Sequence, residues 1–256
     1  MYFAINIGNT TILLGLMKEQ EILFTSRLHT DRRSTADEYA VMIRELLYIH
    51  GVSVEDVHGA IVSSVVPALQ TVISEAIQAL TGHEALMVGP GVKNGLKIRI
   101  DDPGQLGAGQ VAYAVAAAAY YSMPAIVLGI STATSFSVLD RNGSYIGGVI
   151  MPGIRVSLDA LTGATSQLPQ IGLAGRKAKV IGTNTIDAMR SGVLHGTAAS
   201  LDGMIAKIRA EIGEDAMVIA TGRQAKEIIP YCSTEIVYDQ DLVLKGLGII
   251  YEKNRK

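Results

Sequence analysis

The sequence predicts an α/β protein made of two similar halves, and three observations support this. Short apolar segments of strand length alternate with helical segments along the chain, which is typical of α/β architecture. The order of strand, strand, strand, helix, strand and helix occurs twice. In each half the first strand runs into a turn of small polar residues, NIGNTT in the first half and GISTATS in the second. We therefore expect two domains, residues 1–118 and 119–256.

The first half combines strands with helices whose starts are marked in the sequence. A helix is expected from Thr35 to about His50, because Thr35 and Glu38 have the spacing of a capping box. Pro67 is a favourable first residue for a second helix. The alanine-rich segment before Pro124 is interpreted as a third helix. The predicted strands of this half are 2–7, 11–17, 21–29, 59–65 and 84–89.

The second half repeats this order. Asn142 and Gly143 form a dipeptide that is typical of a tight hairpin turn between two strands. Residues 166–183 are interpreted as a loop. The remaining predicted elements are strands over 125–130, 134–140, 144–150 and 216–221, and helices over 153–165, over 184–212, after Gly222 and from about Gln240.

The composition indicates a large apolar core and argues against several kinds of partner. Of the 256 residues, 48% are hydrophobic and 18% are charged, and the low charged fraction suits an oligomer that buries part of its surface. The net charge of −2 argues against nucleic acid and anionic membranes as partners. Residues 103–139 carry no charge, but Pro124 and the strand-like segments after it argue against a membrane span. The single cysteine, Cys232, and an N-terminus without signal-peptide features predict a cytoplasmic protein.

Eight segments resemble segments of the type III pantothenate kinases, and they occur in the same order along nearly the whole chain. The first, NIGNTT at 6–11, is similar to the Asp-x-Gly-Asn-Thr phosphate turn of that family. Eight such segments in order are far more specific than any one of them. The others are TDRRSTADEY (30–39), SSVVP (63–67), GPGVKNGL (89–96), GGVIMPG (147–153), LP (168–169), IGTNTIDAMRSGVLHG (181–196) and ATG (220–222).

This resemblance implies a fold, a reaction and a set of ligands. The family belongs to the superfamily of actin and the sugar kinases, which implies two ribonuclease-H-like domains with a nucleotide cleft between them. The implied reaction is the phosphorylation of pantothenate by ATP, the first step of coenzyme A biosynthesis. The implied cofactors are ATP, Mg²⁺ and either K⁺ or NH₄⁺. The resemblance also implies a homodimer that binds its small-molecule substrate near the dimer interface.

The resemblance further implies roles for particular positions. Asn6 occupies the magnesium position, Gly129 the position of a monovalent-cation ligand, and Gly109 the position of the general base. The positions implied for the ATP phosphates are Asn6, Gly8, Asn9, Thr10, Thr11 and Thr132. The positions implied for the substrate are Ile100, Gly107, Ala108, Gln110 and Thr185.

The chain departs from the family at these chemical positions. The family has aspartates where this chain has Asn6, Gly109 and Gly129, and it has an arginine and a tyrosine where this chain has Gln110 and Ile100. Magnesium prefers hard oxygen ligands, usually with one or two carboxylates, and a positioned base contributes roughly 10²–10⁴-fold to a rate. We therefore predict that most or all kinase activity is lost. The chain would then act as a ligand- or partner-binding pseudokinase, or form a mixed dimer with an active paralogue.

The alternative is an active kinase in which Asp101 or Asp102 serves as a relocated base. The simpler interpretation of these two residues is an Asx turn before Pro103, which we favour. Residues 31–33, DRR, are interpreted as a solvated loop rather than a phosphate clamp. The segment GAGQVA at 107–112 matches a dinucleotide-binding pattern, but no strand precedes it, and we treat the match as a coincidence.

Overall fold

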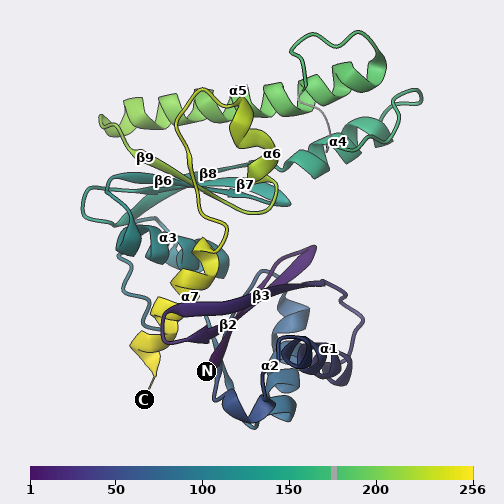
Figure 1. Ribbon diagram of the computed structural model, residues 1–256. Helices are drawn as coiled ribbons and strands as arrows, with labels where there is room; N and C mark the ends of the chain where they lie inside the picture. The colour runs from purple at the N-terminus through teal and green to yellow at the C-terminus, as the bar shows by residue number, and fades with distance from the viewer. Residues whose placement is uncertain (174–177, 256) are drawn as a thin grey trace. The chain divides into compact units, whose positions relative to one another are not determined.

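The computed structural model describes residues 1–173 and 178–255, and the chain forms two compact units (Figure 1). Unit 1 is Met1–Tyr120 together with the segment that begins at Asp241, and unit 2 is Tyr121–Gln240. Each unit is built on one five-stranded sheet. The boundary differs from the predicted domains, 1–118 and 119–256, chiefly because the last helix packs in unit 1.

Unit 1 contains a mixed sheet with helices on both faces. Its strands are β1 (Tyr2–Ile7), β2 (Thr11–Lys18), β3 (Glu21–His29), β4 (Ala60–Ser64) and β5 (Ala85–Met87). Its helices are α1 (Ala36–Ile49), α2 (Pro67–Thr81), α3 (Ala108–Tyr120) and α7 (Leu242–Asn254), with 3₁₀ helices η1 (Val54–Asp56) and η2 (Pro103–Gln105). The strand order is β3-β2-β1-β4-β5. Strands β1 to β3 form an antiparallel meander, and β4 runs parallel to both β1 and β5.

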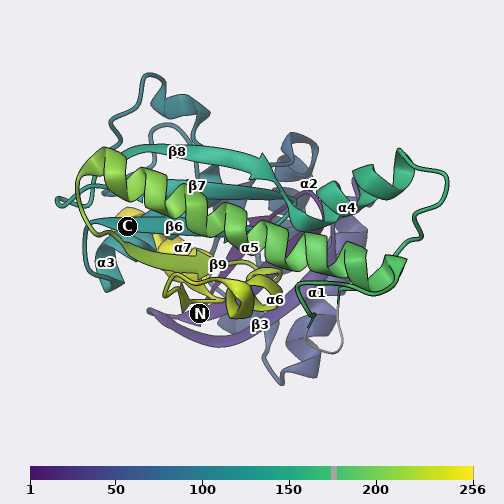
Figure 2. The same ribbon diagram turned by 90° about the horizontal axis from the view of Figure 1, so that it is seen from above.

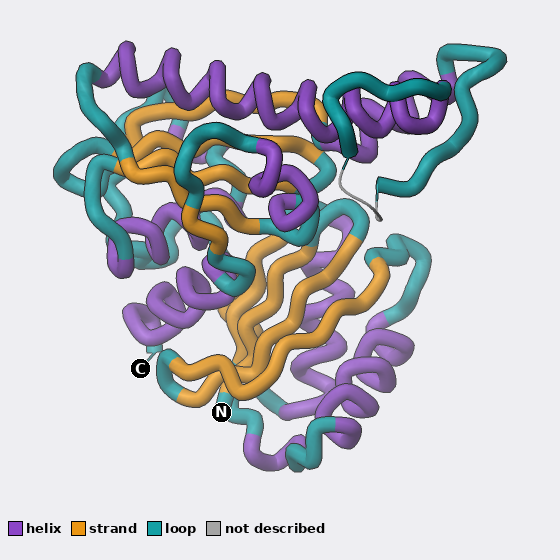
Figure 3. The backbone as a smooth tube through the Cα atoms, turned by 45° about the horizontal axis from the view of Figure 1, so that its top comes forward, coloured by secondary structure: helices purple, strands orange, loops and turns teal. Residues whose placement is uncertain are grey.

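The alternation of side chains along β1 explains why both faces of this sheet are covered. Phe3 points to the face that packs against α1 and α2, where it shares a core with Ile43. Ala4 points to the opposite face, where it shares a second core with Val115 of α3 and Leu247 of α7. Figures 1 and 3 show the two pairs of helices on opposite sides of the sheet.

Helix α7 belongs to unit 1 because it packs tightly against α3. The two helices cross at Gly246, where a Cβ atom would overlap the backbone oxygen of Ala112. On the sheet side, a Cβ atom at Gly15 of β2 would lie 2.8 Å from Leu244 Cδ1. An apolar helix at the end of the sequence suits either half equally well, so the pattern alone did not assign it to unit 1.

Unit 2 has the same kind of sheet. Its strands are β6 (Ala125–Ile130), β7 (Ala133–Leu139), β8 (Tyr145–Pro152), β9 (Met217–Thr221) and β10 (Val237–Tyr238). Its helices are α4 (Ile154–Gly163), α5 (Thr185–Ile212) and α6 (Ala225–Ile228), followed by the 3₁₀ helix η3 (Ile229–Tyr231). The strand order is β10-β9-β6-β7-β8.

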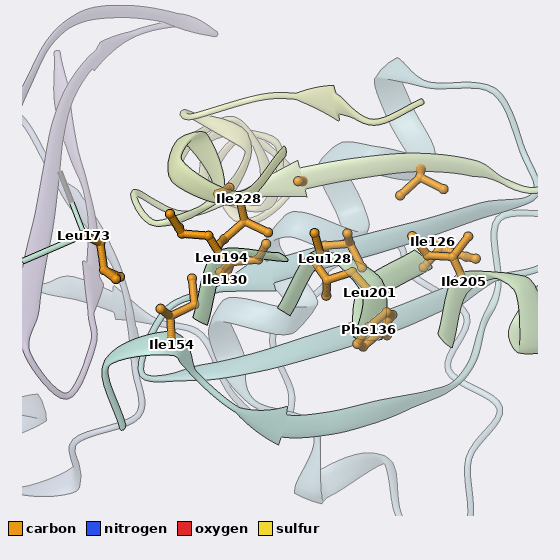
Figure 4. Close-up of a cluster of buried hydrophobic side chains, with 14 of the residues drawn as sticks. Ile126, Leu128, Ile130, Phe136, Ile154, Leu173, Leu194, Leu201, Ile205 and Ile228 are labelled. Carbon is orange, nitrogen blue, oxygen red and sulfur yellow. The ribbon is translucent and has the colours of Figure 1, made fainter. Parts of the chain in front are cut away.

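The long helix α5 lies across one face of the sheet of unit 2, as the view in Figure 2 shows. Its apolar residues include Leu194 and Leu201, which point toward the sheet in Figure 4. There they share a buried cluster with Leu128 of β6 and Phe136 of β7. The spacing of seven residues between the two leucines places them on one face of the helix.

The two sheets repeat one topology, which confirms the predicted α/β fold class with duplicated units. In each sheet the first three strands are antiparallel, and the fourth strand pairs in parallel with the first. The predicted capping box is also confirmed, because Thr35 and Glu38 satisfy each other's backbone N–H groups. The two-residue strand β10 was not predicted. Within the described ranges, no helix is both long enough and apolar enough to cross a membrane.

Candidate active site

The first polar turn connects β1 to β2 and is closed by its own backbone. Gly8 N donates a hydrogen bond to Thr11 O at 3.0 Å, and a Cβ atom at Gly8 would lie only 3.1 Å from that same oxygen. Thr30, which follows β3, holds the turn from the side. Its Oγ1 donates to Gly8 O at 2.8 Å and its backbone N donates to Thr10 O at 3.1 Å. The turn is therefore fixed in shape, while Asn9 and Thr10 remain exposed.

A cationic side chain contacts this turn. Arg32 Nη2 donates to Asn9 Oδ1 at 3.3 Å, and both residues are exposed. Guanidinium groups bind phosphate well, because their donors match the oxygens of an anion. The sequence interpretation of 31–33 as a solvated loop did not anticipate this contact. The only sign of it in the sequence was a pair of arginines, Arg32 and Arg33, that begins three residues after the end of a strand.

Asn6 lies just before the turn and is held by a serine from the neighbouring strand. The parallel register of β1 and β4 places Asn6 opposite Ser63. The buried Ser63 hydroxyl donates to Asn6 Oδ1 at 2.8 Å. This contact joins residues 57 positions apart in sequence. The sequence motif SSVVP contained Ser63, but only the strand register shows which residue it contacts.

Gly109 lies beside the same amide. It is in the first turn of α3, and a Cβ atom at this position would lie 3.0 Å from Asn6 Oδ1. The structure therefore brings together two positions that the sequence resemblance assigned to different roles, the magnesium position and the base position. The three groups that meet here, from Asn6, Ser63 and Gly109, are all neutral.

This neutral set does not match the preference of Mg²⁺ for carboxylate ligands. The carbonyl oxygen of Asn6 already accepts a hydrogen bond from Ser63, and Gly109 has no side chain. No group of three or more His, Cys, Asp or Glu residues suited to a metal occurs in the described part of the chain.

The two aspartates before α3 differ in their surroundings. Asp102 Oδ1 accepts a hydrogen bond from Gly104 N at 3.0 Å, and its Oδ2 accepts one from Gln105 Nε2 at 2.9 Å. Asp102 thus caps the short helix η2, in the manner of the Asx turn that we favoured from the sequence. Asp101 is also exposed, and its carboxylate forms no hydrogen bond or ion pair with the residues that the structure describes.

The residues assigned to the substrate by resemblance fall in both units. Gly107, Ala108 and Gln110 lie at the start of α3 in unit 1, and Gln110 Oε1 lies 3.4 Å from the position of a Cβ atom on Gly107. Ile100 is half-buried in the segment before η2. Thr185 is the first residue of α5 in unit 2, where it is exposed beside the helix cap formed by Asn184.

The second polar turn connects β6 to β7 in unit 2. Gly153 N donates to Thr132 O at 3.0 Å, and a Cβ atom at Gly153 would overlap the backbone oxygens of Ser131 and Thr132. Gly222, with φ of +97°, likewise leaves no space for a Cβ atom beside Ile130 O. The glycines of the GGVIMPG and ATG segments therefore let two backbone segments approach this turn closely.

Gly129, the predicted position of a cation ligand, is buried within β6 just before this turn. It pairs with Ser135 of β7 and Thr221 of β9, and both partners are buried. Because Leu128 and Ile130 join the core beneath α5, Gly129 faces the other side of the sheet. Its surroundings in the sheet therefore supply hydroxyl groups rather than a carboxylate.

Comparison with known proteins identifies the family. The family model described as type III pantothenate kinase matches residues 2–207. The type III pantothenate kinase of Moorella thermoacetica is 39% identical over 254 residues, which cover 99% of this chain and 100% of that protein. The enzyme of the same name from Syntrophobacter fumaroxidans is 40% identical over 256 residues, which cover 100% of this chain and 99% of that protein.

Solved structures support the fold at lower identity. A protein from Campylobacter jejuni that is described as a Baf family transcriptional activator has a TM-score of 0.60 at 18% identity, with 98% of both chains covered. A polyphosphate/ATP-glucomannokinase from Arthrobacter has a TM-score of 0.52 at 16% identity, with 99% of both chains covered. These likenesses fit a duplicated ribonuclease-H-like fold. The chain is a member of the type III pantothenate kinase family, whose enzymes are ATP-dependent kinases.

Proposed function

We propose that this chain has kept the fold and the phosphate turn of its family, has lost most or all kinase activity, and acts by binding a ligand or a partner protein. The observation that supports this is the neutral contact between Asn6, Ser63 and Gly109. A kinase neutralises the charge of the transferring phosphoryl group and positions a base for the attacking hydroxyl. Neither a magnesium carboxylate nor a base is present at these positions.

The size of the expected loss follows from the missing base alone. A positioned general base contributes roughly 10²–10⁴-fold to the rate. The rate losses from residues that act together are not additive. The loss of all three carboxylates is therefore expected to be smaller than the product of three separate losses. The predicted turnover is therefore at least about 10²-fold below that of an acid-complete relative, meaning a family member with aspartates at all three positions.

The phosphate turn gives the reason to expect nucleotide binding without turnover. The backbone of Gly8 and Thr10 is braced by Thr30, and Arg32 brings a positive charge to Asn9. These contacts need no metal carboxylate. ATP is the ligand that family membership implies, and we propose that binding is weak because Mg²⁺ is not held by a protein carboxylate.

The decisive experiment is phosphopantothenate formation from ATP by the purified protein. The reaction would contain Mg²⁺ or Mn²⁺ with K⁺ or NH₄⁺. The matched comparison is the triple variant Asn6→Asp/Gly109→Asp/Gly129→Asp, and both proteins would first be compared by thermal unfolding. We expect no product from the natural chain and measurable product from the variant. Product formation by the natural chain at an ordinary kinase rate would refute the proposal.

The runner-up function is an active kinase with a relocated base, and one observation favours Asp101 over Asp102 for that role. Asp102 is engaged on both oxygens by Gly104 and Gln105, whereas the carboxylate of Asp101 has no partner among the described residues. If the natural chain forms product, Asp101→Asn should abolish it, and Asp102→Asn should leave most of it.

We also propose that the chain assembles as a homodimer through an apolar surface of unit 2. The surface consists of residues on α4, on the segment that precedes α5 and at the start of α5. All are exposed, Ile181 to 80% and Val180 to 70%. Exposed apolar residues that gather in one patch commonly mark protein interfaces, and these residues are neighbours in sequence or on α4 and α5, which contact each other. The members are Val156, Leu161, Val180, Ile181 and Ile186.

Light scattering after size-exclusion chromatography tests this assembly. We expect the mass of two chains for the natural protein and of one chain for Val180→Asp/Ile181→Asp. The control Tyr48→Asp/Ile49→Asp changes exposed apolar residues of unit 1 and should remain a dimer. Co-expression with an acid-complete relative would show whether a mixed dimer forms. A natural chain that runs as a monomer would refute the dimer.

A further inference from the structure

A cavity lies in unit 1 at the end of β1 that is remote from the turn between β1 and β2. Its volume is about 510 Å³, within the usual range for small-molecule sites. Met1, Tyr2 and Arg255 are among its lining residues. Figures 1 and 3 show the start and the end of the chain together in this region. Because β1 advances roughly 3.3 Å per residue, the five steps from Tyr2 to Ile7 separate the cavity from the turn by about 17 Å.

Basic side chains outnumber acidic ones in the lining of this cavity. Lys18, His58 and Arg255 line it, and Glu19 is its only acidic lining residue among those described. The guanidinium of Arg255 forms an ion pair with Glu252, with Nη1 3.7 Å from Oε1. This separation is too long for a hydrogen bond, so the N–H donors of Arg255 can still reach a bound group. Lys18 and Arg255 are both largely exposed, so they reach the cavity from its rim.

Two stacked, uncharged tyrosines line the cavity. The rings of Tyr2 and Tyr251 stack with their centroids 4.0 Å apart, and Tyr2 is buried. Burial, together with the nearby negative charge of Glu252, raises the pKa of Tyr2 well above its usual value. The phenol therefore stays protonated, and it donates a 2.6 Å hydrogen bond to the backbone oxygen of Glu19.

That hydrogen bond holds an unusual backbone conformation at the rim. Glu19 has φ of +55°, and it is the one residue other than glycine with a positive φ in the described part of the chain. A left-handed conformation is unfavourable for a residue with a side chain. Strain of this kind concentrates at ligand sites, where the surrounding structure enforces it. Here it fixes the turn that carries Lys18.

The C-terminal end of α7, which borders the cavity, carries partial negative charge. One of its four terminal carbonyls is satisfied, because Arg255 N donates to Tyr251 O at 2.9 Å. Two carboxylates, Glu19 and Glu252, also oppose an anion here. The side chains of Lys18 and Arg255 and the N-terminal ammonium of Met1 together leave an excess of positive charge at the cavity.

We propose that this cavity binds a small multivalent anion of the phosphate type, through Lys18, His58 and Arg255. This site is separate from the turn at Gly8 and does not depend on whether the chain has kinase activity. Inorganic phosphate is the probe, measured by isothermal titration calorimetry at constant ionic strength, with chloride as the compensating anion.

The variant Lys18→Ala/Arg255→Ala tests the site, and Arg44→Ala/Lys97→Ala is its matched control. The control removes the same charge from other exposed positions of unit 1. We expect the dissociation constant for phosphate to rise at least about tenfold in the cavity variant, which is about 1.4 kcal/mol, and to change by less than about twofold in the control. Absence of saturable binding to the natural chain, or an equal change in both variants, would overturn the proposal.

A spectroscopic readout separates this site from the phosphate turn. The ring protons of His58, assigned by comparison with His58→Ala, should shift during a phosphate titration of the natural chain. The shift should persist in Thr10→Val, which alters the turn, and should vanish in Lys18→Ala/Arg255→Ala. Loss of the shift in the turn variant alone would place the phosphate at the turn and refute a separate site.

Discussion

Acids introduced at positions 6 and 109 should repel each other, because the structure places these positions in contact. A Cβ atom at Gly109 would lie 3.0 Å from Asn6 Oδ1, so the carboxylates of Asn6→Asp and Gly109→Asp would lie about 4 Å apart. Two charges at that distance interact by about 1 kcal/mol in bulk water and about 4 kcal/mol at the effective dielectric of a protein surface. Both positions are half-exposed, so the expected coupling energy is about 1–4 kcal/mol.

The pH dependence of this coupling has a definite sign. Like-charge repulsion raises the pKa of one carboxyl in the folded state above its unfolded value of about 3.9, by roughly 1–3 units for the energies above. The penalty is therefore absent below about pH 4, grows as the pH rises through the folded-state pKa, and is constant above it. Added Mg²⁺ would screen the pair, so the first measurements belong in EDTA.

Urea unfolding of the natural chain, both single variants and the double variant measures this coupling as a double-mutant cycle. We expect the double variant at pH 8 to be less stable than the sum of the singles by about 1–4 kcal/mol, and to be close to additive at pH 4. As a control, Asn6→Asp combined with Gly203→Asp should be additive at both pH values, because Gly203 lies in α5 of unit 2 with no atom within 4 Å of its Cβ position. Additivity of the 6 and 109 pair within about 0.5 kcal/mol at pH 8 would refute the contact.

Three further predictions concern stability. Thr35→Ala removes a helix cap and should lower the free energy of unfolding by about 1 kcal/mol in urea. Gly246→Ala forces a Cβ atom onto the backbone of α3 and should destabilise the protein by about 1–3 kcal/mol, whereas Gly203→Ala on open α5 should be neutral or stabilising. Burial opposes ionisation of Asp202, but hydrogen bonds from the N–H groups of Ser233 and Thr234 outweigh it and lower its pKa. The stabilisation by Asp202 should be complete above the pKa that its carboxyl has in the unfolded chain. It should be lost as the pH falls through the lower pKa of the folded state. The melting temperature of Asp202→Asn should therefore lack this part of the pH dependence.

Most helices and strands could be predicted from the sequence, because the residues that mark their ends are close together in the chain. Thr35 and Pro67 mark helix starts through their own backbone chemistry, and Gly143 adopts the positive φ expected of a hairpin turn. The strands of both sheets were found because apolar runs of strand length are bounded by turn residues. Strand β10 is only two residues long, too short to produce a pattern.

The contacts of the candidate site were less predictable, because they join distant parts of the chain. The motif containing Asn6 was recognised, but its hydrogen bond to Ser63 depends on the register of two parallel strands. The approach of Gly109 to the same amide depends on where α3 begins over the sheet. The sequence analysis placed Arg32 in a solvated loop. Its contact with Asn9 could not be predicted, because the sequence does not show which part of the fold a loop arginine lies against.

The position of α7 determines the order in which the chain can fold during its synthesis. Unit 2 is one continuous stretch, so it can complete its core as soon as Gln240 has left the ribosome. Unit 1 begins first, but until residues 242–254 emerge it lacks α7, one of the two helices that cover one face of its sheet. Until then Ala4 and Val115 lack their partner Leu247, and the nascent chain exposes that apolar surface to chaperones. The part that is made first is therefore the last to become stable.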